Sequence, residues 1–81
     1  MPDLSERFLE AALDRYKADR AEAVASIHLL VHNPVGIGDH SDILNEIDKW
    51  VKSLSESEEK IATLKNNFSH LLSCHREADK T

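Results

Sequence analysis

Three histidines near the middle of the chain are the residues most able to bind a metal. His28 and His32 are four positions apart, so a helix places both imidazoles on one face. His40 follows a short stretch with proline and glycine, so a chain reversal there would gather all three rings. Imidazole pairs at this spacing can bind zinc or nickel. Solvated histidines near the negative end of a helix are the simpler interpretation, so we expect no metal and keep these three as the candidates.

A second group of ligand-type residues lies near the C-terminus. His70 and Cys74 share a helical face, and His75 follows directly, but the same hairpin supplies no fourth ligand. A small, partly buried cysteine is the simpler interpretation. Cys74 and His75 do not form a nucleophile–base pair either, because successive residues of a helix point about 100° apart. The sequence therefore predicts no enzyme, no catalytic residue and no cofactor.

Two glycines lie just before the second helical pattern, in Gly36-Ile37-Gly38. Helix N-termini after such loops bind phosphate in other proteins. Here Asp39 fills the anion position itself, and no strand pattern precedes the loop. The glycines therefore indicate a tight turn and not a nucleotide-binding loop.

Size and charge narrow the class of protein. The chain has 81 residues and a net charge of −5, with acids and bases interleaved along its length. A chain of this length forms at most one domain. The lack of a basic block disfavours nucleic acid as a partner. A single cysteine forbids an internal disulfide, and no apolar leader opens the sequence. We expect a cytoplasmic protein that does not insert into membranes.

The first helix is expected near residues 3–32. No proline or glycine interrupts this segment, and it must end before Pro34, which pushes its predecessor out of the helical region. The residues expected to face a partner helix, which we call the seam, are spaced alternately four and three positions apart. This spacing is a heptad pattern. The seam consists of Leu9, Leu13, Tyr16, Arg20, Ala23, Ile27 and Leu30, with Phe8, Ala12, Val24 and Val31 widening the stripe.

The second helix is expected near residues 39–77, with a turn at 33–38. Asp39 is a good N-cap, and Asp42 follows three positions later. The seam has a weak centre at 55–59, where no large apolar residue falls, and a thinner contact is expected there. It consists of Ile43, Ile47, Trp50, Leu54, Ser57, Ile61, Leu64, Phe68, Leu71 and His75, widened by Leu44, Val51 and Leu72.

Two long helices joined by a short connection predict an all-α antiparallel hairpin. One partner helix is not expected to cover the whole stripe, above all at Trp50, Val51, Phe68 and Leu72, so we expect assembly into a helical bundle. A homodimer is the first expectation, ahead of a trimer or tetramer. The expected interface residues are Leu13, Tyr16, Ile27, Ile47, Trp50, Val51, Leu54, Ile61, Leu64, Phe68, Leu71 and Leu72.

Three stretches of the chain stand out together: the turn and helix start at 33–43, Glu46-Ile47, and residues 58–64. They resemble small uncharacterised helical-hairpin proteins of contractile-tailed bacteriophages, including cyanophages. The resemblance covers about 30 residues and holds no catalytic motif. It implies a phage or phage-like setting in the host cytoplasm and an accessory role, and no functional residue is carried over from it.

The leading functional expectation is a non-catalytic oligomeric interaction module, such as a phage accessory or assembly factor. We expect self-association and a protein partner, with no nucleic acid and no membrane. The stretch Ser53 to Glu59 is the expected polar opening. The alternative is a metal- or small-ligand-binding helical protein, which would use the histidines around the turn or pockets between protomers lined by residues such as Tyr16 and Arg20.

Overall fold

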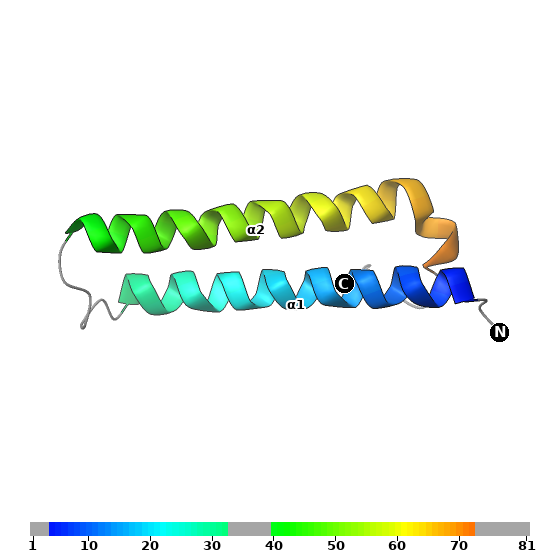
Figure 1. The fold of residues 1–81 in the computed structure, drawn as a ribbon, viewed down its shortest axis with the longest axis horizontal. Coiled ribbons are helices and arrows are strands. Elements are labelled where there is room, and N and C mark those ends of the chain that lie inside the picture. Colours follow the sequence, from blue (N-terminus) through cyan, green and yellow to red (C-terminus); the bar gives the residue numbers. More distant parts are fainter. Residues whose placement is uncertain (1–3, 33–39, 73–81) are drawn as a thin grey trace.

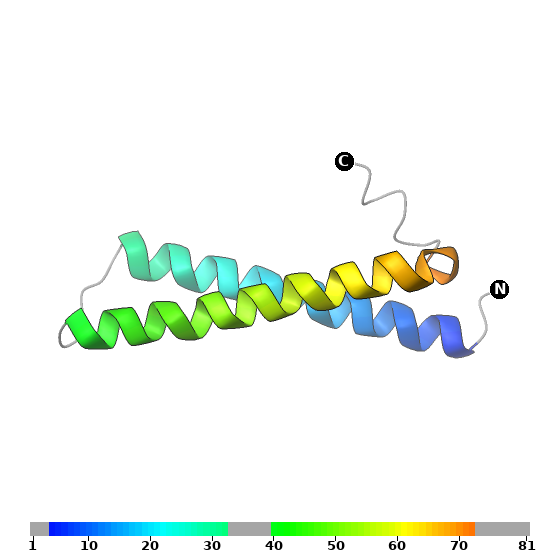
Figure 2. The same ribbon diagram turned by 90° about the horizontal axis from the view of Figure 1, so that it is seen from above.

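The computed structural model describes residues 4–32 and 40–72 of the chain. They form two α-helices, α1 (Leu4–His32) and α2 (His40–Phe68), and one turn of 3-10 helix, η1 (Ser69–Leu71). The helices lie side by side and run in opposite directions (Figure 1), and they cross at a shallow angle (Figure 2). The antiparallel all-α hairpin is therefore confirmed. The turn at 33–38, the cap at Asp39 and all residues after Leu72 lie outside the described part.

The predicted heptad seam of α1 faces α2. Leu13 and Ala23 are buried, and the other five seam positions of this helix are half-buried. Of the positions that were expected to widen the stripe, Phe8, Val24 and Val31 are exposed, whereas Ala12 is half-buried. The spacing of the apolar residues thus predicts which side of α1 is covered, because side chains three and four apart share a helical face.

Two small side chains are buried near the centre of the hairpin. Ser57 is buried on α2, and its hydroxyl donates to the carbonyl oxygen of Ser53 at 2.8 Å, so its polar group is satisfied within its own helix. Ala23 is fully buried on α1. The separation of packed helices depends on the side chains between them, so small residues favour close approach. A thinner contact was expected at residues 55–59 of the second helix, and within this stretch Ser57 is buried.

α2 ends earlier than the sequence predicts. Phe68, with φ −133° and ψ 21°, leaves the helical conformation, and the N–H of Leu72 donates to the carbonyl oxygen of Ser69 at 3.1 Å. The side-chain amide of Asn67 donates to the carbonyl oxygen of Thr63 at 2.8 Å, one turn back along the same helix. The prediction of one α-helix continuing to residue 77 is wrong at 69–72.

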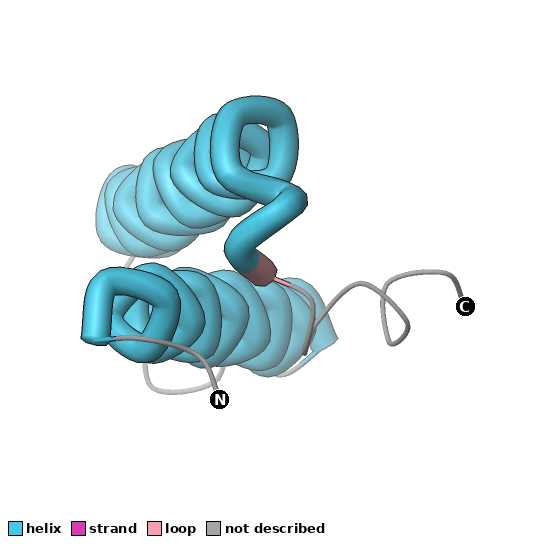
Figure 3. The backbone as a smooth tube through the Cα atoms, turned by 90° about the vertical axis from the view of Figure 1, so that its right-hand side faces the viewer, coloured by secondary structure: helices cyan, strands magenta, loops and turns pink. Residues whose placement is uncertain are grey.

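The early end of α2 allows Leu72 to reach the core. η1 turns away from the axis of α2 toward α1 (Figure 3). Leu72 is 2% exposed and clusters with Leu13 and Ile61. Complete burial of a leucine stabilises the fold by about 1.5–3 kcal/mol, which offsets the loss of regular helix. The expectation that Leu72 stays exposed on a single hairpin is therefore wrong.

The hairpin is long and its core is thin. It measures 52 by 19 by 18 Å, and the fully buried apolar residues among those described are Leu13, Ala23, Ile61 and Leu72. Neither described helix has an apolar stretch that would allow it to cross a membrane. Most of the large apolar side chains therefore remain half-buried or exposed along the length of the hairpin.

Candidate functional site: a groove and an apolar strip

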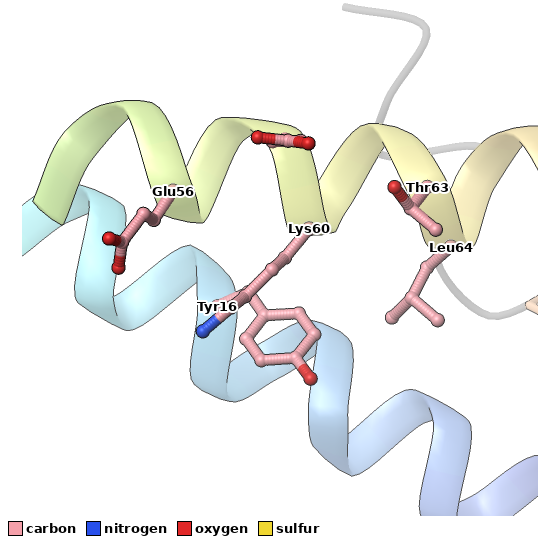
Figure 4. Close-up of a pocket in the computed structure, with 6 residues that line it drawn as sticks. Tyr16, Glu56, Lys60, Thr63 and Leu64 are labelled. Atoms are coloured by element: carbon pink, nitrogen blue, oxygen red, sulfur yellow. The ribbon is translucent and has the colours of Figure 1, made fainter. Parts of the chain in front are cut away.

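An open groove of about 350 Å³ lies between the helices, on the part of the hairpin away from the turn. Tyr16 is half-buried on α1 and contributes its aromatic ring (Figure 4), while α2 contributes the charged and polar side chains. The lining residues are Tyr16, Glu56, Glu59, Lys60, Thr63 and Leu64.

Lys60 is the residue that connects the two walls of this groove. Its Nζ atom lies 5.4 Å from the centroid of the Tyr16 ring, so the two helices are linked by a cation–π contact. Such contacts at exposed sites contribute about 0.5–1 kcal/mol. Lys60, Glu56 and Glu59 are exposed, and water screens their charges. The groove therefore offers a ring, an ammonium group and two carboxylates to a partner at the surface.

The two histidines at the end of α1 lie on one face of the helix, as predicted. The rings of His28 and His32 are stacked, with centroids 5.7 Å apart and planes 20° apart, and both side chains are exposed. Among residues 4–32 and 42–72, no group of three or more histidine, cysteine or acidic side chains is placed to hold a metal ion. The side chain of His40 lies outside the described part, as do Cys74 and His75, so both predicted clusters remain untested.

The predicted interface residues fall into three classes of burial. Three lie in the hairpin's own core, namely Leu13, Ile61 and Leu72. Seven are half-buried along the seam, namely Tyr16, Ile27, Ile47, Trp50, Leu54, Leu64 and Leu71. Val51 and Phe68 are exposed, at 47% and 38%. Only the second and third classes have surface left for another molecule.

A strip of exposed apolar residues runs along one flank of the hairpin, next to the turn. It consists of Val24 and Val31 on α1 and Leu44 and Val51 on α2, which are 39% to 66% exposed; we call these four residues the apolar strip. The two residues on each helix are seven positions apart, so they form one stripe per helix.

The register of the hairpin brings the two stripes together. The contact of Tyr16 with Lys60 and the cluster of Leu13 with Ile61 fix which residues share a level. Because both helices rise by the same distance per residue, the same register holds along the hairpin. It places Val24 level with Val51, and Val31 level with Leu44. Each strip residue directly follows a seam residue, and equivalent flanking positions of antiparallel helices lie on the same side.

Sequence reasoning located the groove in part. It named Tyr16 as a residue that could line a pocket between protomers, and Tyr16 lines this groove within one hairpin. It placed the polar opening at 53–59, whereas the groove extends to Leu64 and depends on Lys60, which was missed. The available signal was that Lys60 directly precedes the seam residue Ile61, at a flanking position close to the level of Tyr16.

Comparisons with known proteins add no relative to this description. No family model, curated protein or solved structure matches the chain. The resemblance of the turn region to phage proteins therefore stays a prediction.

Proposed function

We propose that the protein is a non-catalytic interaction module that acts as a homo-oligomer, with a dimer as its basic unit. The apolar strip carries this proposal. Soluble monomers expose single apolar residues at many places, but several exposed apolar residues that share one flank are typical of an interaction site. Here the four residues of the strip continue outward from half-buried seam residues such as Ile27 and Ile47.

The thin core of the hairpin supports self-association. A chain of 81 residues buries a small share of its surface, and small domains commonly gain stability from assembly. Two hairpins packed together would form a four-helix bundle with a shared interior, which is a common solution for amphipathic helices. The folded state would then depend on the concentration of the protein.

Sedimentation equilibrium at micromolar concentration tests this proposal. We expect a mass of about two chains of 9.1 kDa each, with dissociation on dilution. Thermal unfolding followed by circular dichroism should shift to higher temperature as the concentration rises. A single species of 9.1 kDa with a concentration-independent transition would refute it.

The charge of the surface indicates the kind of partner that the module would bind. A net-acidic, interleaved surface fits a protein partner better than a phosphate backbone. In the phage setting suggested by the turn region, the module would serve as an accessory or assembly factor. Affinity purification from infected host cells would test that setting, since salt-sensitive recovery of nucleic acid alone would contradict a protein partner.

A second candidate function is metal binding at the turn, favoured by the stacked rings of His28 and His32. Calorimetric titration with Zn²⁺ or Ni²⁺ separates the two functions. The interaction module predicts weak binding. Tight stoichiometric binding that is lost in the His28→Ala/His32→Ala double variant would establish the metal function instead.

A further inference from the structure

The flank that carries the apolar strip changes character along its length. The next flanking positions away from the turn are occupied by Lys17 and Glu10 on α1 and by Glu58 and Lys65 on α2. The same register sets Lys17 level with Glu58, and Glu10 level with Lys65. This flank is therefore apolar in the half near the turn, and it presents opposite charges at matching levels in the other half.

We propose that this flank is the interface with a second copy of the chain, and that the two hairpins lie in parallel with both turns at the same end. The inference rests on the proposed self-association and specifies its surface and orientation. A two-fold axis along the long direction of the hairpin sets α1 of one copy against α2 of its partner. Every level of the flank then meets the same level of the other copy.

Charge and apolar surface are both complementary in this arrangement. Val24 meets the partner's Val51, and Val31 meets the partner's Leu44, so the apolar strip of each copy covers the other. Lys17 meets the partner's Glu58, and Glu10 meets the partner's Lys65, which places opposite charges together. Matching of this kind gives orientation and specificity to an interface.

The reversed arrangement is less favourable. With the turns at opposite ends and full overlap, the apolar strip of one copy would cover the charged half of the other. Charged groups would then lose water to apolar side chains of the second copy, which costs free energy. Sliding the hairpins until only the strips overlap avoids this cost, but the charged half of each flank then adds no contact between the two copies.

The shape of the flank also suits a second hairpin. The next positions outward hold small residues near the middle of the flank, Ala21, Ser55 and Ala62, and small side chains favour close approach of helices there. The other positions of this row hold larger polar residues, namely Arg7, Asp14, His28 and Asp48. A face of a body 52 Å long and 19 Å wide is large enough for the roughly 800 Å² per partner that stable dimers bury.

Variants on two sides of the same helices test the surface. Val24→Glu/Leu44→Glu buries four carboxylates in the proposed dimer, and we expect its dissociation constant to rise at least about a hundredfold. Leu29→Glu is the matched control, since Leu29 is 63% exposed in the same half of α1 but lies about 140° and 160° around the helix from Val24 and Val31. It should leave the constant unchanged. Val24→Thr keeps the shape and adds one hydroxyl, and it should weaken the dimer severalfold while circular dichroism stays helical.

A spin-label distance tests the orientation in the full chain. Arg7→Cys in a Cys74→Ser background places one label per copy far from the turn. The parallel dimer brings the two labels within about 25 Å, because neighbouring helices pack 8–10 Å apart. Reversed hairpins would separate them by about 35 Å with full overlap, or about 60 Å when only the strips overlap, at about 1.5 Å per residue.

The outcomes separate this inference from the proposed function. A wild-type chain that stays at 9.1 kDa refutes both. A wild-type dimer that survives the glutamates but dissociates in Leu29→Glu retains the proposed function and overturns the surface. An unchanged dissociation constant in Val24→Thr overturns the surface even where the glutamate variant does not fold. A label distance near 35 Å or 60 Å overturns the parallel orientation.

Discussion

Replacing Leu72 by alanine should destabilise the fold, because this residue directly follows a short 3-10 turn and is almost fully buried. It is 2% exposed and shares one cluster with Leu13 and Ile61. Losing the burial of a leucine costs about 1.5–3 kcal/mol, and leucine-to-alanine changes in closed cores cost about 2–5 kcal/mol. Since η1 follows the end of α2 and can settle into part of the vacated space, we expect the lower part of that range, about 2 kcal/mol.

Urea unfolding followed by far-UV circular dichroism measures this loss, at one fixed protein concentration. Leu29→Ala is the matched control, because it removes the same atoms from a side chain that is 63% exposed. It should change the free energy of unfolding by less than about 0.5 kcal/mol. Equal effects of the two changes would mean that Leu72 does not dock against the core in solution.

A double-mutant cycle sharpens the same test. Leu13 and Leu72 belong to one buried cluster, so their alanine variants should not be additive. Residues that share a cavity commonly couple by about 0.5–3 kcal/mol. A straight α-helix continuing past Phe68 would carry Leu72 away from Leu13, and the coupling would then vanish. Strict additivity would therefore refute the turn formed by η1.

Three further predictions concern the seam and the groove. Phe68→Ala should cost about 1–2 kcal/mol in urea unfolding, below the 3–5 kcal/mol of a closed core, because Phe68 is 38% exposed. Ala23→Leu should cost about 1–3 kcal/mol by overpacking the close helix contact, and a melting temperature equal to wild type would contradict that packing. Lys60→Met should cost less than about 1 kcal/mol, and a cost also seen when Tyr16 is leucine would show that the cation–π contact is not its origin.

Local periodicity predicted most of the hairpin. The seam of α1 was identified at every position from Leu9 to Leu30, because helical spacing alone decides which side chains share a face. The end of α1 also follows from a local rule, since the residue before Pro34 is disfavoured in the helical region. Local rules therefore capture the length of α1 and the direction and covered side of both helices, but not the length of α2.

The end of α2 was not predictable in the same way. Residues 69–77 continue the heptad spacing well enough to suggest helix. The chain instead gains more from turning Leu72 into the core beside Leu13, and that gain appears only once the two helices are packed. Lys60 was missed for a related reason. Its significance comes from the ring of Tyr16 on the other helix, which no spacing within α2 reveals.

The two ends of the proposed interface flank differ in a way that bears on function. Away from the turn, Leu72 directly follows a seam residue as the strip residues do, but it is buried in a cluster with Leu13 and Ile61, so the hairpin covers it with its own chain. Near the turn, Val31 and Leu44 occupy the equivalent positions and stay exposed at 59% and 66%. If stability of the single hairpin alone explained the apolar stripe, both ends should be covered alike. The apolar residues near the turn are therefore available to another molecule, whereas Leu72 closes the fold of the single hairpin. A substitution in the apolar strip should accordingly alter association more than helicity.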